Sequence, residues 1–500
     1  MDTLEEYDVE ADGVIVKIKI IGGKGVTTTY EVQTPQSSPV TIALLERVRH
    51  ELITEVAVTT QEILDPKVIN KLKDKFRIKA ESILTQKITN INPTTRNYLI
   101  GTLLQEMIGL GKIEYLLNDP NLEEIIINSA EEPVRVFHKR YGWVLTNIKV
   151  ESEAQIQNYA NIIARRVGRQ ITTLNPLLDA HLTTGDRANA VLYPISNKGH
   201  TITIRKFARD PWTVTDMIVN KTSDTKLFAL IWLAIQYEMN ILISGGTGSG
   251  KTSFLNVCMA FVPPNHRIIS IEDTRELQLP EFLYWAPLTT RQPNPEGKGE
   301  ITMLDLLVNS LRMRPDRIIL GEMRRRAEAE VLFEAMHTGH SVYATVHADT
   351  INETITRLVN PPLEIPPNLL AAVNLNVVMF RDRRKGIRRT NQVGEFLVSE
   401  EGGRITIKPN ILYRWKPTTD TVVSFQESVR FYEDLSRHTG LSLAEINKDI
   451  ATKKEILEYM VKNKLRDIHT VGKIINKYYL DEDFVVKNVQ NNKSPDDLLK

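Results

Sequence analysis

The pattern of hydrophobic and polar positions divides the first part of the chain into a strand region and a helical region. Residues 13–21 alternate between apolar and polar side chains, and residues 27–32 do so after a glycine-rich turn, which predicts a β-hairpin. From about residue 42 to residue 117, apolar side chains recur every three or four positions, as in amphipathic helices. We therefore expect an N-terminal hairpin and helical module over residues 1–118.

Shorter elements follow between residues 119 and 208. Alternating runs at residues 124–128 and 134–138 predict strands, and the apolar spacing between residues 152 and 167 predicts one amphipathic helix. This mixture indicates a small α+β domain. An Asp-Pro sequence then interrupts the pattern, so we expect a linker over residues 209–222.

Continuous apolar strands alternate with helical stretches over residues 223–400. The apolar runs lie at residues 241–244, 267–271, 317–320 and 342–346. Strands that are apolar on both faces and separated by helices indicate a mostly parallel sheet covered on both sides, that is, an α/β domain. Because the pattern from residue 424 onward is helical and amphipathic, we expect a C-terminal helical extension over residues 401–500.

Composition and charge narrow the class of protein. Of the 500 residues, 42% are hydrophobic and 25% are charged, which is typical of a soluble globular protein. The net charge of +1 gives no general attraction to nucleic acid or to an anionic membrane. Cys258 is the single cysteine, which excludes an intramolecular disulfide and a zinc site of several thiolates. Without a secretory signal or an apolar run near the ~20 residues that span a bilayer, a cytoplasmic protein is expected, with membrane contact limited to its surface.

A glycine-rich loop follows the apolar run at residues 241–244 and precedes a helical stretch. The loop consists of Gly245, Gly246, Thr247, Gly248, Ser249, Gly250, Lys251 and Thr252. It matches the Walker A pattern in the strand-loop-helix context that makes this motif specific. Its backbone amides and the helix N-terminus would surround the phosphates of ATP, with Lys251 at the β- and γ-phosphate oxygens and Thr252 on Mg²⁺. A glycine-rich turn that binds nothing would leave Lys251 unexplained.

Two further strands end in acidic residues. Glu272 and Asp273 follow the run at 267–271, and Glu322 follows the run at 317–320. In a parallel sheet such strand ends lie beside the phosphate loop, so Glu322 is our candidate for polarising the attacking water and for the magnesium site. Glu272 and Asp273 would hold the water shell of the magnesium ion or share the task of Glu322. Capping of nearby helices is the alternative for each acid taken alone.

His340 and His347 flank the apolar run at residues 342–346. A single histidine is usually a structural residue. Here the alternative is that the pair hydrogen-bonds the acidic residues or senses the γ-phosphate. Zinc binding would need further ligands at suitable spacing.

These four elements occur in an order that resembles the secretion-ATPase superfamily, which powers type II and type IV secretion, type IV pili and the archaellum. Residues 271–277 resemble the aspartate box of that family, residues 311–322 its atypical Walker B motif, and residues 336–347 its histidine box. The resemblance extends over roughly residues 100–480. It implies a RecA-like motor domain that hydrolyses ATP with Mg²⁺, preceded by a PAS-like α+β domain.

The resemblance also implies roles for arginines in the domain before the motor. Arg187 and Arg205 lie in segments similar to those whose arginines reach the γ-phosphate in the family. Structural salt bridges are the alternative for both, and Arg312 and Arg314 are weaker candidates for the same charge-stabilising role. The family likewise implies a homo-oligomeric ring of six subunits that works with a polytopic inner-membrane platform protein to assemble a pilus or export a protein.

Some features resemble the archaeal secretion and pilus-assembly branch of the family. The tetracysteine zinc module common in bacterial assembly ATPases cannot form in this chain. After Glu322 the sequence continues Met-Arg-Arg-Arg, whereas many members of the family have glycine after Glu-x-Arg. This segment and the loop at residues 360–367 resemble the archaeal group. The departure leaves the arginine cluster without an assigned role and weakens an assignment to the archaellum motor.

A dense basic run occupies residues 381–389. A solvated hairpin is the simplest interpretation, and a subunit contact or a surface for acidic loops of a membrane partner is the alternative. RecA-like rings also drive nucleic-acid strands, so a nucleic-acid motor is the rival hypothesis, against which the near-neutral charge and the lack of interleaved aromatic residues argue. A P-loop protein that traps ATP without turnover is a third possibility, which the acidic residues and the histidines disfavour.

Overall fold

The computed structural model describes residues 2–23, 26–35, 38–56, 69–88, 91–182, 185–207, 210–293, 297–401 and 404–499. The chain divides into two compact units, Met1–Arg209 and Asp210–Lys500. Each unit has its own sheet and its own hydrophobic core. None of the helices within the described residues combines the length and the apolar character that a membrane span requires.

The first unit is built on a mixed sheet to which its described residues contribute nine strands, in the order β1-β2-β3-β6-β5-β4-β9-β8-β7. The strands are β1 (Asp2–Ala11), β2 (Val14–Gly23), β3 (Val26–Gln33), β4 (Leu122–Ile127), β5 (Arg135–His138), β6 (Gly142–Thr146), β7 (Leu177–His181), β8 (Arg187–Val191) and β9 (Thr201–Arg205). Neighbouring strands are antiparallel except β3 and β6, which are parallel. The predicted hairpin is confirmed as β2 and β3, and β1 adds a strand that the sequence pattern did not predict.

Helix α6 (Glu153–Arg166) packs its apolar face onto this core, as the spacing between residues 152 and 167 predicted. Ser152 begins the helix, because its side-chain oxygen accepts a hydrogen bond from an amide of the first turn. The buried carboxylate of Asp119 accepts hydrogen bonds from the hydroxyl groups of Tyr7 (2.7 Å) and Tyr30 (2.6 Å). These bonds fasten β1 and β3 to the rest of the unit.

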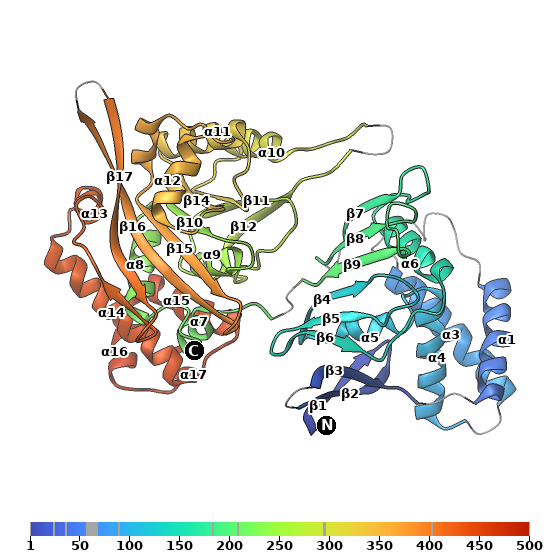
Figure 1. Ribbon diagram of the computed structural model, residues 1–500. Coiled ribbons are helices and arrows are strands. Elements are labelled where there is room, and N and C mark those ends of the chain that lie inside the picture. Colours follow the sequence, from blue (N-terminus) through green and yellow to red (C-terminus); the bar gives the residue numbers. More distant parts are fainter. Residues whose placement is uncertain are drawn as a thin grey trace. The chain divides into compact units, whose positions relative to one another are not determined.

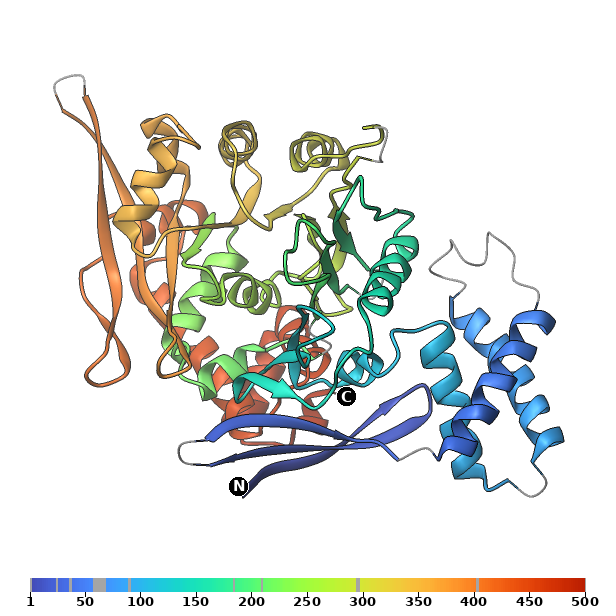
Figure 2. The same ribbon diagram turned by 45° about the vertical axis from the view of Figure 1, so that its right-hand side comes forward.

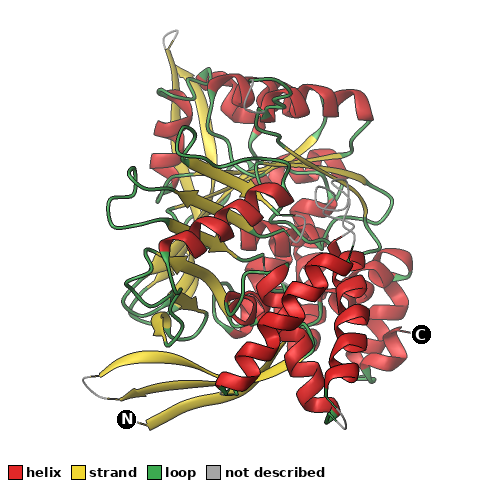
Figure 3. Cartoon of the chain, turned by 90° about the vertical axis from the view of Figure 1, so that its right-hand side faces the viewer, coloured by secondary structure: helices red, strands yellow, loops and turns green. Residues whose placement is uncertain are grey.

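A helical group contacts the N-terminal strands, as expected for residues 42–117. Its helices are α1 (Pro39–Glu55), α3 (Ile69–Lys87), α4 (Pro93–Met107) and α5 (Ile113–Asn118). The strands β1–β3 run from the N-terminus toward this group (Figure 2 and Figure 3). The turn between β1 and β2 rests on the helices, since Lys73 forms an ion pair of 2.7 Å with Asp12 and a Cβ atom at Gly101 would collide with Val14.

The described residues of the second unit form a nine-stranded sheet in the order β12-β11-β13-β14-β10-β15-β16-β17-β18. The strands are β10 (Ile241–Gly245), β11 (Arg267–Glu272), β12 (Tyr284–Thr289), β13 (Arg317–Leu320), β14 (Ser341–Val346), β15 (Leu375–Asp382), β16 (Ile387–Glu401), β17 (Arg404–Lys416) and β18 (Thr421–Ser424). Neighbours are parallel from β12 to β15 and antiparallel from β15 to β18. The predicted apolar strands are confirmed, and the sheet is mostly parallel, as expected, with an antiparallel part from β15 to β18.

Helices cover both faces of this sheet (Figure 1). One face packs against α8 (Thr225–Gln236), α9 (Lys251–Met259) and the C-terminal helices, and the other against α10 (Met303–Ser310), α11 (Arg326–His337) and α12 (Ile351–Val359). Within β10, Ile241 and Ile243 enter the first core and Leu242 enters the second. Because both faces are buried, the strands are continuously apolar in sequence. The short 3-10 helices are η1 (Leu311–Met313) and η2 (Pro367–Ala372).

Two expectations about segment boundaries need correction. The linker expected over residues 209–222 contains helix α7 (Val214–Val219), which a capping box begins and whose Val214 and Met217 are buried in the same core as Ile241 and Ile243. The extension expected to be helical over residues 401–500 begins with β17 and β18, because β17 pairs along the length of β16. The helices that follow are α13 (Phe431–Thr439), α14 (Leu443–Lys462), α15 (Ile468–Leu480), α16 (Glu482–Gln490) and α17 (Pro495–Leu499).

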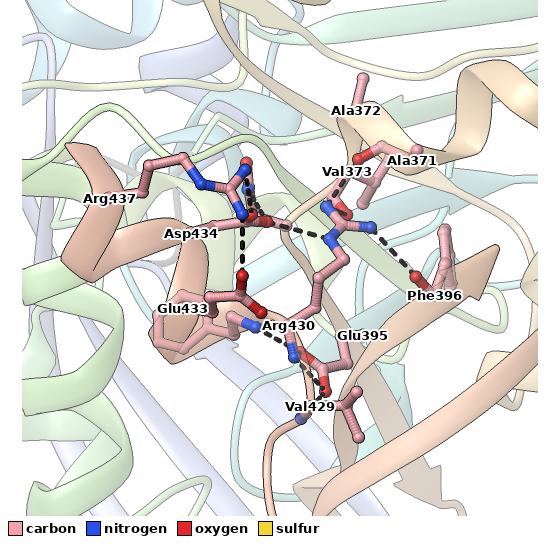
Figure 4. A network of polar contacts seen from close by, with 12 residues as sticks. Ala371, Ala372, Val373, Glu395, Phe396, Val429, Arg430, Glu433, Asp434 and Arg437 are labelled. Carbon is pink, nitrogen blue, oxygen red and sulfur yellow. Dashed lines mark hydrogen bonds and ion pairs between the residues drawn. The ribbon is translucent and has the colours of Figure 1, made fainter. Parts of the chain in front are cut away.

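A buried polar network joins the C-terminal helices to the sheet (Figure 4). Glu395 of β16 is 1% exposed, and its carboxylate accepts hydrogen bonds from the amides of Val429 (2.7 Å) and Phe431 (2.6 Å) at the start of α13. Arg430 donates to the carbonyl oxygen of Phe396 over 3.0 Å. The carboxylate and the guanidinium thus fix the position of α13 against the sheet.

Candidate functional site

The glycine-rich loop lies between β10 and α9 in the second unit. The φ angles of Gly245 (151°), Gly248 (72°) and Gly250 (93°) lie in the left-handed region that favours glycine. A Cβ atom at Gly245 would also lie 2.5 Å from the carbonyl oxygen of Met379 in β15. Glycine is therefore required here both by the backbone conformation and by the close approach of the neighbouring strand.

Lys251 begins α9, and its side chain turns back over the loop. Its Nζ atom donates to the carbonyl oxygens of Gly245 (3.0 Å) and Gly246 (3.2 Å) and lies 3.4 Å from Nδ1 of His347. Burial lowers the pKa of Lys251, and the negative charge of Glu322 opposes this effect. A half-buried ammonium group bound to neutral carbonyl oxygens would gain stronger, charge-assisted hydrogen bonds from phosphate oxygens.

Acidic residues from two neighbouring strand ends converge on one arginine. Strands β11 and β13 pair in parallel, so Asp273 and Glu322, which follow them, lie at the same edge of the sheet. Arg324 donates to Oε2 of Glu322 through Nη2 (2.5 Å) and Nε (2.9 Å), and to Oδ2 of Asp273 through Nη1 (2.8 Å). A forked guanidinium that binds both carboxylates fixes their positions relative to each other.

His347 connects these acidic residues to the phosphate loop. It follows β14, which lies between β13 and β10 in the sheet. Its Nε2 lies 2.8 Å from Oε1 of Glu322, and its Nδ1 lies 3.4 Å from Nζ of Lys251. Burial and the positive charge of Lys251 lower the pKa of His347, although Glu322 opposes them. The ring is therefore neutral near pH 7, with Nε2–H donating to Glu322 and Nδ1 accepting from Lys251.

Glu272 occupies a more enclosed position, at the end of β11. It is 2% exposed, and its Oε1 accepts hydrogen bonds from the amides of Glu276 (2.9 Å) and Leu277 (3.2 Å). Within the part of the chain that the structure describes, its Oε2 is buried without a hydrogen-bond partner. Burial raises the pKa of Glu272 to about 7. This carboxyl group can therefore exchange a proton near neutral pH, as a general acid or base must.

The side chains present fit a magnesium ion that is held mainly by a nucleotide. Among the described residues, no group of three or more His, Cys, Asp or Glu side chains could hold a metal ion by itself. Mg²⁺ keeps several waters and usually takes one or two protein ligands together with phosphate oxygens, so it does not need such a cage. Thr252 lies in the first turn of α9, next to Lys251, and its hydroxyl group would be such a ligand.

His340 does not belong to this cluster. It precedes β14 whereas His347 follows it, and the strand between them has six residues. At the rise of an extended strand, the two histidines are separated by about 20 Å and lie at opposite edges of the sheet. Nδ1 of His340 lies 3.2 Å from Oγ1 of Thr338 and 3.3 Å from the carbonyl oxygen of Ala335, at the end of α11. His340 therefore lies away from the phosphate loop of its own chain, and a catalytic role for it stays a prediction.

In the first unit, Arg187 and Arg205 are directly opposite each other on the paired strands β8 and β9. Arg187 forms a bidentate ion pair with Asp179, through Nε (2.9 Å) and Nη2 (2.7 Å). Arg205 faces Glu124 across the pairing of β9 with β4. Like charges opposite each other on antiparallel strands repel, which favours an anion beside them. The structural salt bridge exists for Arg187, and the nucleotide role of both arginines stays a prediction.

Reasoning from the sequence missed two arginines near the phosphate loop, Arg324 and Arg388. Arg324 belongs to the arginine cluster that had no assigned role. Arg388, in the basic run at residues 381–389, donates from Nε to the carbonyl oxygen of Gly248 over 3.1 Å. The run does form a hairpin, between β15 and β16. The missing information was the strand order, which places β15 beside β10.

Comparison with known proteins places the chain in a family. The model of the Type II/IV secretion system protein family matches residues 106–399, which is more than half of the chain. The match includes the phosphate loop, the acidic strand ends and both histidines. The chain belongs to the type II/IV secretion system protein family. The resemblance expected from the sequence is confirmed.

Individual proteins resemble the chain to different extents. An uncharacterised protein of Methanocaldococcus jannaschii is 35% identical over 399 residues, which are 78% of this chain and 71% of that protein. The type IV secretion system protein PtlH of Bordetella pertussis is 30% identical over 302 residues, 54% of this chain and 88% of PtlH. Among solved structures, the VirB11 ATPase of the Brucella suis type IV secretion system, in complex with sulphate, is 25% identical, with a TM-score of 0.29 and coverage of 56% of this chain and 90% of that one.

Proposed function

We propose that the chain is a Mg²⁺-dependent ATPase whose second unit is a RecA-like motor for type IV pilus assembly or protein secretion. The observation that carries this proposal is the polar network that runs from Lys251 through His347 and Glu322 to Arg324 and Asp273. Its members follow parallel strands or the glycine-rich loop, at the edge of the sheet where α/β proteins bind their ligands. A network made only for stability would not need to end at a half-buried lysine over a Walker A loop.

Each side chain has a role in this proposal. Lys251 binds the β- and γ-phosphates, and the hydroxyl group of Thr252 holds Mg²⁺, with Glu322 beside the ion. Bound Mg²⁺ neutralises charge on the phosphates. Glu322 orients the attacking water, and its carboxylate is kept in place by His347 on one oxygen and by Arg324 on the other.

The rest of the proposal follows from the family. A ring of six subunits would work with a polytopic inner-membrane platform protein at the cytoplasmic face of the membrane. Arg187 and Arg205 of the first unit would reach the γ-phosphate and report its loss. Membership of the type II/IV secretion system family and similarity to PtlH, whose name is type IV secretion system protein, support this assignment. Similarity to a protein of Methanocaldococcus jannaschii supports the archaeal branch.

The deciding experiment is steady-state hydrolysis of Mg-ATP by the purified protein, with native mass spectrometry to measure the oligomer. Turnover by the wild type, its loss in Glu322→Gln and a mass of six subunits would support the proposal. Stimulation by archaeal-type lipid vesicles would support action at a membrane. Stimulation by DNA instead would indicate a nucleic-acid motor, and unchanged turnover in Glu322→Gln would reject Glu322 as the water-orienting residue.

A further inference from the structure

The basic hairpin between β15 and β16 lies against the phosphate loop. Arg381 and Arg388 are directly opposite each other on these antiparallel strands. A Cβ atom at Gly248 would lie 2.7 Å from Nη1 of Arg381, and one at Gly250 would lie 3.3 Å from Cδ of Arg388. Nε of Arg388 donates to the carbonyl oxygen of Gly248 over 3.1 Å. Two arginines from one hairpin thus contact the loop.

This arrangement concentrates positive charge beside the phosphate loop. Two like charges directly opposite each other on antiparallel strands destabilise the pair by electrostatic repulsion. The neighbouring Arg389 shows the structural solution, since it is 5% exposed and binds both oxygens of Asp420, over 2.6 Å and 2.8 Å. Asp382, on the same hairpin, accepts hydrogen bonds from backbone amides of the turn. Arg381 and Arg388 lie against a loop that the Walker A pattern assigns to polyphosphate.

We propose that Arg381 and Arg388 are nucleotide-binding residues that place two positive charges at the phosphate loop from the side opposite the acidic cluster. The inference rests on the proposed function and extends it to a hairpin outside the four family motifs. Arg388 also holds the conformation of the loop through its bond to Gly248. The negative charge of the bound polyphosphate then offsets the repulsion between the two arginines, so nucleotide binding stabilises the hairpin.

The test is equilibrium binding of mant-ADP and mant-ATP to the full-length protein, followed by fluorescence. Arg381→Gln and Arg388→Gln are each expected to weaken binding about tenfold, the usual effect of losing one charge-assisted contact. Arg388→Lys keeps the charge, and we expect binding within about threefold of the wild type. Competition by inorganic pyrophosphate should weaken in parallel, because the contact is to phosphate and not to the base. Circular dichroism checks that each variant is folded.

Matched controls separate this inference from the proposed function. Arg384→Gln removes one charge from the exposed turn of the same hairpin and should leave affinity within twofold of the wild type. Lys251→Ala should abolish binding if the Walker A loop holds the nucleotide. If Lys251→Ala abolishes binding while both Gln variants bind like the wild type, the inference is overturned and the proposed function stands. If Arg388→Lys loses as much affinity as Arg388→Gln, the role of Arg388 is structural and the inference is again overturned. Normal binding by Lys251→Ala would reject the proposed function itself.

Discussion

Glu322 and His347 follow two adjacent parallel strands, and Oε1 of the carboxylate lies 2.8 Å from Nε2 of the ring. The other ring nitrogen lies 3.4 Å from Nζ of Lys251, so one imidazole connects the phosphate loop to the candidate catalytic acid. Because its pKa is lowered, the ring is neutral near pH 7. A neutral ring orients Glu322 by one hydrogen bond without cancelling its negative charge.

The first prediction compares the two histidines of the histidine box. His347→Ala is expected to lower kcat for ATP hydrolysis about 100-fold, since Glu322 loses a hydrogen bond that orients it. His340→Ala should keep kcat within about threefold of the wild type, because His340 lies about 20 Å away along the strand. Steady-state kinetics on both variants, with thermal unfolding to check folding, measure the difference. Equal losses in the two variants would contradict the assignment.

The same ring predicts how hydrolysis depends on pH. Protonation of His347 adds a positive charge beside Lys251 and removes the acceptor at Nδ1. The wild-type rate should therefore fall as pH drops through the lowered pKa of His347, that is, below the ordinary histidine value near 6.5. In His347→Gln, which cannot titrate, this acidic limb should disappear from the kcat profile. An acidic limb that persists in the variant would show that another group causes it.

How far the sequence predicted the site depends on what brings its residues together. The glycine-rich loop, Asp273 and Glu322 were found because each follows an apolar run, and parallel strands bring such ends to one edge. His340 was named as a site residue although the pattern placed an apolar run between it and His347, so the two histidines lie at opposite ends of one strand.

Contacts made across the sheet were out of reach of the sequence. Arg324 and Arg388 lie in basic runs. From the sequence pattern, each of the several arginines in these runs could equally be exposed to solvent. Their partners are set by the strand order, which places β15 beside β10 and β13 beside β11. The fold was predicted better than the site, because burial on both faces leaves a direct record in the apolar runs. The elements that the pattern did not predict include β1, α7, β17 and β18.

Arg324 should be important for ATP hydrolysis, although the family resemblance assigns no role to its arginine cluster. Its guanidinium binds Glu322 and Asp273, so Arg324→Ala frees both carboxylates and should lower kcat by about 10- to 100-fold. Arg326→Ala is the matched control, because Arg326 binds Glu330 (2.7 Å) at the surface and should leave kcat unchanged. Hydrolysis rates at saturating ATP measure the effect. Loss of activity in the control alone would refute the role given to Arg324.

Glu272 should make the stability of the folded protein depend on pH. Burial raises its pKa from 4.5 to about 7, so between these values the folded state binds a proton that the unfolded state lacks. Stability from this group is therefore present at low pH and is lost as pH rises through the folded pKa, by up to about 3 kcal/mol. Glu272→Gln stays neutral, and its stability relative to the wild type should rise from pH 5 to pH 8. Urea denaturation at both pH values measures this, and a constant difference would contradict the raised pKa.

The last prediction concerns the network that holds the C-terminal helices. Glu395→Ala leaves the buried amide of Phe431 and the partly buried amide of Val429 without their acceptor, and it should destabilise the protein by about 3–5 kcal/mol. Glu433→Ala removes an exposed ion pair with Arg437, at 2.9 Å, and should cost less than about 1 kcal/mol. Chemical denaturation of both variants gives the comparison. Similar midpoints would mean that α13 is held mainly by the apolar contacts of Phe431 and Leu435, and that the buried carboxylate only replaces hydrogen bonds that water would otherwise supply.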